Sequence, residues 1–176
     1  HISVDKAGKY ALAANYTGGS ACVLPIGDDG KLGKATGFVQ HKGKSVDRER
    51  QEGPHAHSIN LDASNRFAFV ADLGLDQVLV YRFEGDNPTP IKQSVYVEKL
   101  NQPYGIAFYP ADKPQWVYIA ESDGLKRYPY KDGDMEAPKG QDSGVETILD
   151  GIPSEHHWTR DVVFSADGKT MYFSVG

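Results

Sequence analysis

The 176-residue sequence is 11% aromatic and carries 19 glycines and 10 prolines, while only 39% of its residues are hydrophobic. That balance favours many short strands joined by tight turns over long helices. The net charge of −5 is modest and spread along the chain, so nucleic acid and anionic membrane surfaces are excluded as expected partners. No segment reaches the roughly 20 apolar residues that span a bilayer. The single cysteine, Cys22, cannot form an internal disulfide.

Four segments share one pattern, which is a short alternating strand, a polar turn with Gly, Asn or Asp at its tip, and a second apolar strand. They begin at Ile2, Ile59, Ile106 and Val162. Alternation broken by such turns indicates antiparallel hairpins. Second strands are expected at Tyr10–Asn15, Phe67–Asp72, Trp116–Glu121 and Met171–Val175, third strands at Ala21–Ile26, Val78–Phe83 and Leu125–Tyr130, and more polar fourth strands at Thr36–His41, Gln93–Glu98 and Val145–Leu149.

The four repeats begin 57, 47 and 56 residues apart, which is close to the length of one propeller blade. A β-helix would have shorter rungs, and a sandwich would lack this regular recurrence. The sequence therefore predicts an all-β fold, a β-propeller of about 3.5 four-stranded antiparallel blades in an incomplete ring. The chain starts without Met and stops directly after a strand-like run, so we expect a piece of a larger ring with both ends cut.

The repeat also predicts which side chains share one mouth of the ring. In a blade the first strand is innermost and the second runs back beside it, so the start of the first and the end of the second open on the same face. The aligned residues are His57, Tyr104 and Arg160 before first strands, and Asn15, Asp72, Glu121 and Val175 at the ends of second strands. Six of these seven are polar, which is typical of a polar ligand site. The alternative is that strand ends are polar because they are solvated.

Two long connections, residues 41–56 and 150–158, feed this same mouth. The first carries Arg50 and His55, and the second carries His157. A histidine beside Glu and Arg could act as a general base or bind an anionic substrate. Four histidines near the mouth could in principle hold a metal, namely His55, His57, His156 and His157. Pairs of this kind specify no coordination geometry, so no metal site is predicted.

Residues 1 to about 84 resemble the seven-bladed lactonase family, which includes bacterial 6-phosphogluconolactonase and the muconate lactonising enzymes. The matching strings are Ala14–Ser20, Arg50–Ser58 and Val70–Asp76. The resemblance implies hydrolysis of a sugar lactone in the cytoplasm, without a required cofactor. It assigns the catalytic roles to His57 and Glu121, while Tyr104 stands where the family has an arginine. For a sugar or sugar-lactone ligand we predict contacts from Asn15, Arg50, His55, Asp72 and Tyr104.

Residues from about 98 onward resemble instead the sorbosone and aldose sugar dehydrogenases that use pyrroloquinoline quinone (PQQ). The matching strings are Leu100–Pro110, Trp116–Tyr118, Arg127–Tyr130 and His157–Ser165. This resemblance implies sugar oxidation in the periplasm with hydride passing to PQQ, Ca²⁺ as a further cofactor, and cofactor contacts from His157 and Arg160. The base histidine of that family belongs to an earlier blade, which the lactonase-like part replaces.

The two resemblances divide one continuous propeller into lactonase-like blades (1–84), a connector and outer strand (85–98) and dehydrogenase-like blades (99–176). The main hypothesis is a partial or hybrid propeller, an engineered or natural chimera or a composite fragment, that is not a complete enzyme as given. One alternative is an intact parent lactonase. Another is a scaffold without catalysis, in which open blade edges pair between two copies of about 3.5 blades.

Overall fold

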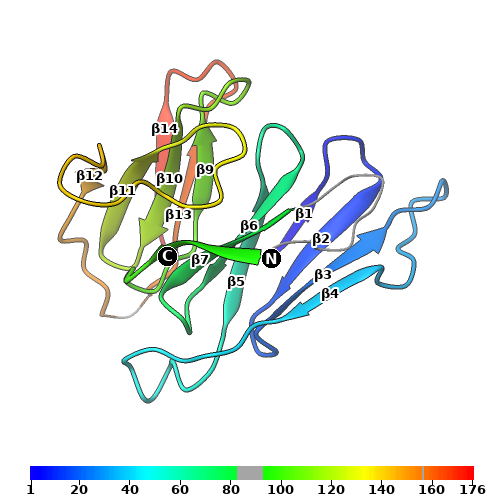
Figure 1. Ribbon diagram of the computed structural model, residues 1–176, viewed down its shortest axis with the longest axis horizontal. Helices are drawn as coiled ribbons and strands as arrows, with labels where there is room; N and C mark the ends of the chain where they lie inside the picture. The colour runs from blue at the N-terminus through cyan, green and yellow to red at the C-terminus, as the bar shows by residue number, and fades with distance from the viewer. Residues whose placement is uncertain (83–92, 156) are drawn as a thin grey trace.

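The computed structural model describes residues 1–82, 93–155 and 157–176. The strands of this part form three four-stranded antiparallel sheets and one two-stranded sheet, set side by side (Figure 1). This arrangement confirms the expected β-propeller of about 3.5 blades in an incomplete ring. No helix in the described residues is long and apolar enough to cross a membrane.

Each blade is a meander in which neighbouring strands are consecutive in sequence. The first blade holds β1 (Ile2–Val4), β2 (Tyr10–Asn15), β3 (Ser20–Pro25) and β4 (Gly37–Gln40), and the second holds β5 (Ala56–Leu61), β6 (Phe67–Asp72), β7 (Gln77–Arg82) and β8 (Gln93–Glu98). The third holds β9 (Ile106–Tyr109), β10 (Trp116–Glu121), β11 (Gly124–Pro129) and β12 (Glu146–Leu149), and the two-stranded blade holds β13 (Arg160–Phe164) and β14 (Met171–Val175).

The predicted second strands match β2, β6, β10 and β14 at both ends. The third strands begin one residue earlier than predicted, because the last residue of each second strand pairs directly with a polar or glycine residue, as Asp72 does with Gln77. The fourth strands were predicted within one residue at each end. Phe83, the connector residues up to 92 and His156 lie outside the described residues.

The polar turns between first and second strands are built around one side chain. Asp5 accepts hydrogen bonds from three backbone N–H groups of the β1–β2 turn. Asp62 does the same in the β5–β6 turn. Gly8 and Asn65 occupy the left-handed position of these two turns, with φ of 69° and 60°. Gly and Asn adopt that conformation at low cost, which explains the predicted turn tips.

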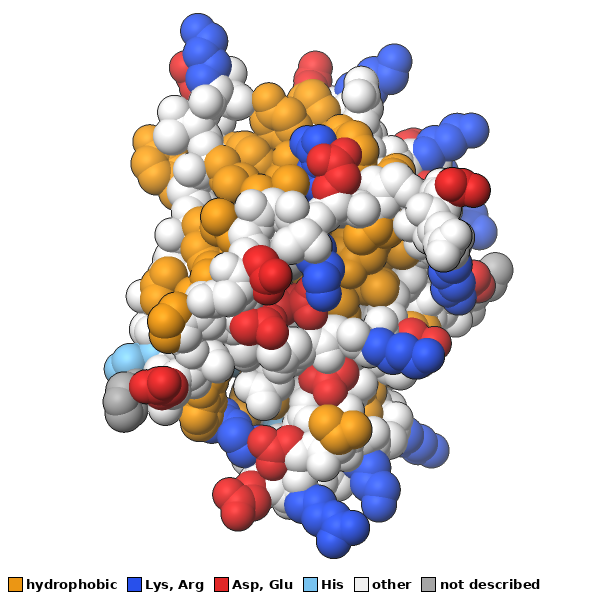
Figure 2. Space-filling view, turned by 90° about the vertical axis from the view of Figure 1, so that its left-hand side faces the viewer, with side chains coloured by type: hydrophobic (Ala, Val, Ile, Leu, Met, Phe, Trp, Pro, Cys, Tyr) orange, Lys and Arg blue, Asp and Glu red, His pale blue; other side chains and the backbone are white. Residues whose placement is uncertain are grey.

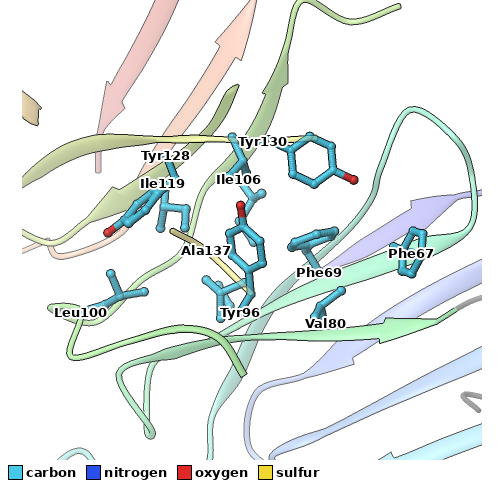
Figure 3. Packing of buried hydrophobic residues seen from close by; sticks show 13 residues of the cluster. Phe67, Phe69, Val80, Tyr96, Leu100, Ile106, Ile119, Tyr128, Tyr130 and Ala137 are labelled. Atoms are coloured by element: carbon cyan, nitrogen blue, oxygen red, sulfur yellow. The ribbon is translucent and has the colours of Figure 1, made fainter. Parts of the chain in front are cut away.

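Apolar side chains fill the space between neighbouring blades, so each sheet buries both of its faces where a neighbour exists. Between the second and third blades Phe69 is fully buried beside Tyr96 (Figure 3). Its ring meets those of Tyr96 and Phe108 edge-on, each at 5.0 Å. Such edge-to-face pairs add to the stabilisation that burial provides. Similar clusters join the first blade to the second and the third to β13–β14.

The two outermost sheet faces of the chain are uncovered. On the two-stranded blade Val163 and Tyr172 are 52% and 57% exposed, and on the first blade Ile2 and Phe38 are 65% and 62% exposed. Figure 2, seen from the side of the third blade, shows hydrophobic side chains among charged ones on that face. Exposed apolar blade faces fit an incomplete ring. Self-association through them stays a prediction.

The long connection before the second blade is held down by Gln51. Its side chain is buried, and Nε2 donates to the carbonyl oxygen of Leu73 at 2.7 Å and to Oδ1 of Asp76 at 2.6 Å. Asp76 also accepts hydrogen bonds from the Ser45 hydroxyl and the Gln102 backbone N–H. One buried carboxylate therefore fixes this connection and the segment that leads into the third blade.

Close packing fixes the last part of that connection. A Cβ on Gly74 would lie 2.0 Å from the carbonyl oxygen of Gly53, and a Cβ on Gly19 would lie 2.4 Å from that of Pro54. Glycines of two blades thus allow the backbone of residues 53–54 to lie against both hairpin ends.

We expect Gly74→Ala to lower the free energy of unfolding by about 2 kcal/mol, because the added methyl group overlaps rigid backbone. Gly53→Ala is the matched control, since a Cβ there meets nothing within 4 Å. Its effect should stay within about 0.5 kcal/mol. Urea denaturation of both variants checks the prediction, and equal stabilities would contradict the packing described.

Candidate functional site

His57 stands at the start of an innermost strand on a β-bulge. In the β5–β6 pair Ala56 faces Asp72 and Ser58 faces Ala71, so His57 is the extra residue of β5. A bulge interrupts the ladder and turns the side chain of its extra residue in a new direction. The sequence predicted the position of His57 at the mouth but not the bulge.

Aromatic rings from three blades meet around His57. Its ring lies 4.5 Å from that of Tyr104 and 4.9 Å from that of Tyr16, measured between centroids. Tyr16 also stacks on His55 at 4.6 Å, and His1 meets Tyr104 edge-on at 6.2 Å. The mouth therefore presents a line of rings with His57 at its centre.

The surroundings of His57 keep its imidazole neutral. Burial lowers its pKa to about 4, helped by the positive charges of the amino terminus, Arg50 and His55 and opposed by Asp72. Nδ1 of His57 is buried and has no hydrogen-bond partner among the described residues. Nε2 is not enclosed in this way. At neutral pH one ring nitrogen is therefore free to accept a proton.

Arg50 joins the two long connections at the mouth, drawn cyan and orange in Figure 1. Its guanidinium lies 3.6 Å from the ring centroid of Trp158, and its Nε is buried without a partner in the described part of the chain. A cation–π contact uses the face of the guanidinium and leaves the N–H groups at its edge available. Arg50 also forms no ion pair with any described carboxylate, so its charge is left for an anionic ligand.

Asp72 and Glu121, the last residues of β6 and β10, bind backbone N–H groups with their carboxylates. Asp72 is fully buried, and its oxygens bond Nδ1 of His41 at 2.5 Å and the backbone N–H of His55 at 2.8 Å. Glu121, also buried, accepts the backbone N–H of Asn101 at 2.7 Å. Its other oxygen lies 2.7 Å from Nζ of Lys126. Both carboxylates thus bind the chain that enters their own blade.

The structure brings four predicted site residues together, namely Arg50, His55, His57 and Tyr104. Asn15 is exposed, and its amide bonds the hydroxyl of its hairpin partner Ser20 at 3.2 Å. Asn15, Asp72 and Glu121 therefore make their hydrogen bonds within the protein. Their predicted roles toward a substrate stay predictions.

Arg160 does not present its charge to the mouth. The side chain is fully buried, and its terminal nitrogens donate to the backbone carbonyl oxygens of Pro153, His157 and Thr159 at 2.5, 2.5 and 3.2 Å. Arg160 thereby holds the connection before β13 in place. The His157 side chain on this connection is exposed.

These contacts do not fit a PQQ site. The dehydrogenase resemblance assigns Arg160 to the quinone, but both of its terminal nitrogens donate to backbone carbonyls of its own connection and the side chain is fully buried. Within residues 1–82, 93–155 and 157–176, no group of three or more His, Cys, Asp or Glu side chains is arranged to hold a metal ion. No step of a reaction is therefore assigned to PQQ.

Sequence reasoning missed Tyr16, Trp158 and Asp161. Tyr16 directly follows the predicted mouth residue Asn15, and Trp158 lies in one of the two connections that feed the mouth. Their closeness in the sequence to predicted site residues was the signal that could have identified them. Asp161 influences Tyr104 through its negative charge. Burial, and then the negative charge of Asp161, raise the pKa of Tyr104, so the phenol keeps its proton at neutral pH.

Comparisons with known proteins agree with a lactonase propeller along the whole chain. The family model described as "Lactonase, 7-bladed beta-propeller" matches residues 1–175, without a break at the proposed connector. The 6-phosphogluconolactonase of Bacillus subtilis is 32% identical over 117 residues, which make up 66% of this chain and 33% of that protein. A solved structure of a candidate 6-phosphogluconolactonase from Bacteroides uniformis is 26% identical with a TM-score of 0.77, covering 98% of this chain and 48% of that one.

The dehydrogenase resemblance of the second half is not confirmed. The PQQ domain of pyranose dehydrogenase from Coprinopsis cinerea is 17% identical with a TM-score of 0.56, over 70% of this chain and 27% of that one. A likeness at this level shows a shared fold alone. The findings therefore support the alternative of a parent lactonase better than the hybrid hypothesis.

The chain spans about half the length of relatives that it matches along its whole length, 49% of the Formosa agariphila 6-phosphogluconolactonase and 48% of the Bacteroides protein. Its three and a half blades fit that share of a seven-bladed ring. The strings that carry the resemblance, residues 14–20, 50–58 and 70–76, build the mouth around His57. The chain belongs to the lactonase family of seven-bladed β-propellers.

Proposed function

We propose that the protein hydrolyses the ester bond of a sugar lactone and that His57 is the general base. The observation that carries this proposal is the position of His57 on the bulge of β5, where the rings of Tyr16 and Tyr104 surround it and its imidazole is neutral. The printed names of relatives, among them 6-phosphogluconolactonase, support it.

The reaction needs no electron transfer. A water molecule adds to the lactone carbonyl carbon while one of its protons passes to the imidazole of His57. The tetrahedral intermediate then breaks the bond between this carbon and the ring oxygen, and the imidazolium returns the proton to that oxygen. The product is a hydroxy acid. A histidine with a pKa of about 4 is a weak base, but its imidazolium is a strong acid for the second step.

The surroundings of Arg50 indicate that the substrate carries an anionic group. It is half-buried, it has no acidic partner among the described residues, and Trp158 covers one face of its guanidinium. The free N–H edge suits two oxygens of a phosphate. We therefore propose a phosphorylated sugar lactone as the substrate class.

The pH dependence follows from the lowered pKa of His57. Below this pKa the imidazole is protonated and cannot accept the proton of water, so kcat/KM should fall with a midpoint near pH 4. Initial rates, corrected for spontaneous hydrolysis and measured from about pH 3 to about pH 7, test this. A midpoint near 6.5, the ordinary value for histidine, would contradict the electrostatics described.

Replacing the base should abolish most of the activity. We expect His57→Gln to lower kcat/KM by about 10²- to 10⁴-fold, as for loss of a general base. His157→Asn is the control, because this side chain is exposed and makes none of the ring contacts at His57. Full activity of His57→Gln would refute the role of His57. An equal loss in His157→Asn would show that the effect is not specific to His57.

Loss of Arg50 should affect binding of the phosphate. We expect Arg50→Gln to raise KM for a phosphorylated lactone by about 10- to 100-fold, the cost of a lost charged hydrogen bond, and to leave the unphosphorylated lactone unaffected. Arg48→Gln is the matched control, since it removes the same charge from an exposed position two residues away. Equal effects of the two variants, or equal effects on both substrates, would contradict phosphate binding by Arg50.

A further inference from the structure

The hydroxyl of Tyr104 has no hydrogen-bond partner among the described residues, although the rest of the residue is firmly held. Its backbone N–H donates to the carbonyl oxygen of Ala120 at 3.0 Å. Its own carbonyl oxygen accepts a hydrogen bond from the Ser58 hydroxyl. The ring packs edge-on between His57 and His1. The residue as a whole is half-buried.

Tyr104 and His57 are tied to each other across two blades. Ser58, the neighbour of His57 in β5, bonds the Tyr104 carbonyl just before β9. The two ring centroids are only 4.5 Å apart, at an interplanar angle of 71°. A proton acceptor and a hydroxyl donor thus occupy fixed and adjacent places at the same mouth, which is the arrangement that preorganised catalysis requires.

Lactone hydrolysis develops negative charge on the carbonyl oxygen when water adds to the carbonyl carbon. A donor for this oxygen must stand beside the base and must keep its proton. Tyr104 meets both conditions, because burial and Asp161 raise the pKa of its phenol. Arg50 stacks on Trp158 of the other long connection and is assigned to the phosphate.

We propose that Tyr104 is a catalytic residue whose hydroxyl donates a hydrogen bond to the carbonyl oxygen of the lactone. The inference rests on the proposed function and extends it. As water adds and His57 takes its proton, the hydroxyl of Tyr104 stabilises the oxyanion of the tetrahedral intermediate. It releases this oxygen when the carbonyl forms again and the ring C–O bond breaks. Tyr104 neither gains nor loses a proton.

Tyr16 is the other tyrosine whose ring contacts His57, but it lies in a different part of its blade than Tyr104 does. It lies in the β2–β3 turn and stacks face to face on His55, at an interplanar angle of 18°. Its carbonyl oxygen lies 3.1 Å from Nδ1 of His55. Tyr104 instead leads into an innermost strand, as His57 does. Tyr16 therefore belongs to the same cluster of rings, and the control comes from outside it. Tyr172 lies on β14, is 57% exposed and makes none of the ring contacts at His57.

The test compares Tyr104→Phe with Tyr172→Phe in lactone hydrolysis. Tyr104→Phe keeps the ring against His57, and it removes a hydroxyl that bonds nothing in the described chain, so the melting temperature should not change. We expect kcat to fall by about 10²- to 10³-fold, as for a lost oxyanion donor, with KM changed by less than about threefold. Tyr172→Phe removes an exposed hydroxyl and should change neither constant by more than about threefold.

Each outcome bears on a defined claim. An active wild-type protein with an unchanged kcat in Tyr104→Phe overturns the catalytic role of Tyr104 and leaves the proposed function standing. A rise in KM alone, or equal losses in Tyr172→Phe, also overturns it. An inactive wild-type protein overturns the proposed function and this inference together. The titration of His57, followed by NMR, should be the same in Tyr104→Phe, and a shifted midpoint would show an indirect effect instead.

Discussion

The folds of the second and third blades depend on a buried carboxylate that binds the backbone entering each of them. Asp72 accepts the N–H of His55, and Glu121 accepts that of Asn101, each from the end of a second strand. These bonds join the chain before an innermost strand to the strand that runs back beside it. They therefore determine where the innermost strand begins, and so where its first side chains stand. Removing one of them would leave a buried donor unpaired, which is costly.

The side chains at the mouth differ in charge. Packing against Tyr16 and Tyr104 buries His57 and keeps its imidazole uncharged at neutral pH. The guanidinium of Arg50 instead lies with its face on the ring of Trp158. Buried nitrogens of Arg50 and His57 lack hydrogen-bond partners in the described part of the chain, which is rare in folded proteins. Under the proposed function, a bound ligand supplies these partners.

The repeat predicted the blades and their second strands well, because alternation and turn residues are local signals. It also placed His57 at the mouth. It could not show that Asp72 and Glu121 bind backbone, because strand-end carboxylates look alike whether they face a ligand or an N–H group. The dehydrogenase resemblance of the second half is not confirmed, and its strings have a structural explanation as well. A Cβ on Gly105 would lie 2.6 Å from Oδ1 of Asp161, so strings at the start of an inner strand reflect blade packing as well as family.

The most direct test of the account is a crystal structure of the protein with the hydroxy-acid product of a phosphorylated lactone. The account predicts that a carboxylate oxygen of the product lies within hydrogen-bond distance of the Tyr104 hydroxyl. The same group should lie beside Nε2 of His57, and the phosphate should contact the guanidinium edge of Arg50. Product bound at the opposite end of the blades, in the groove between Asp62 and Lys131, would contradict it.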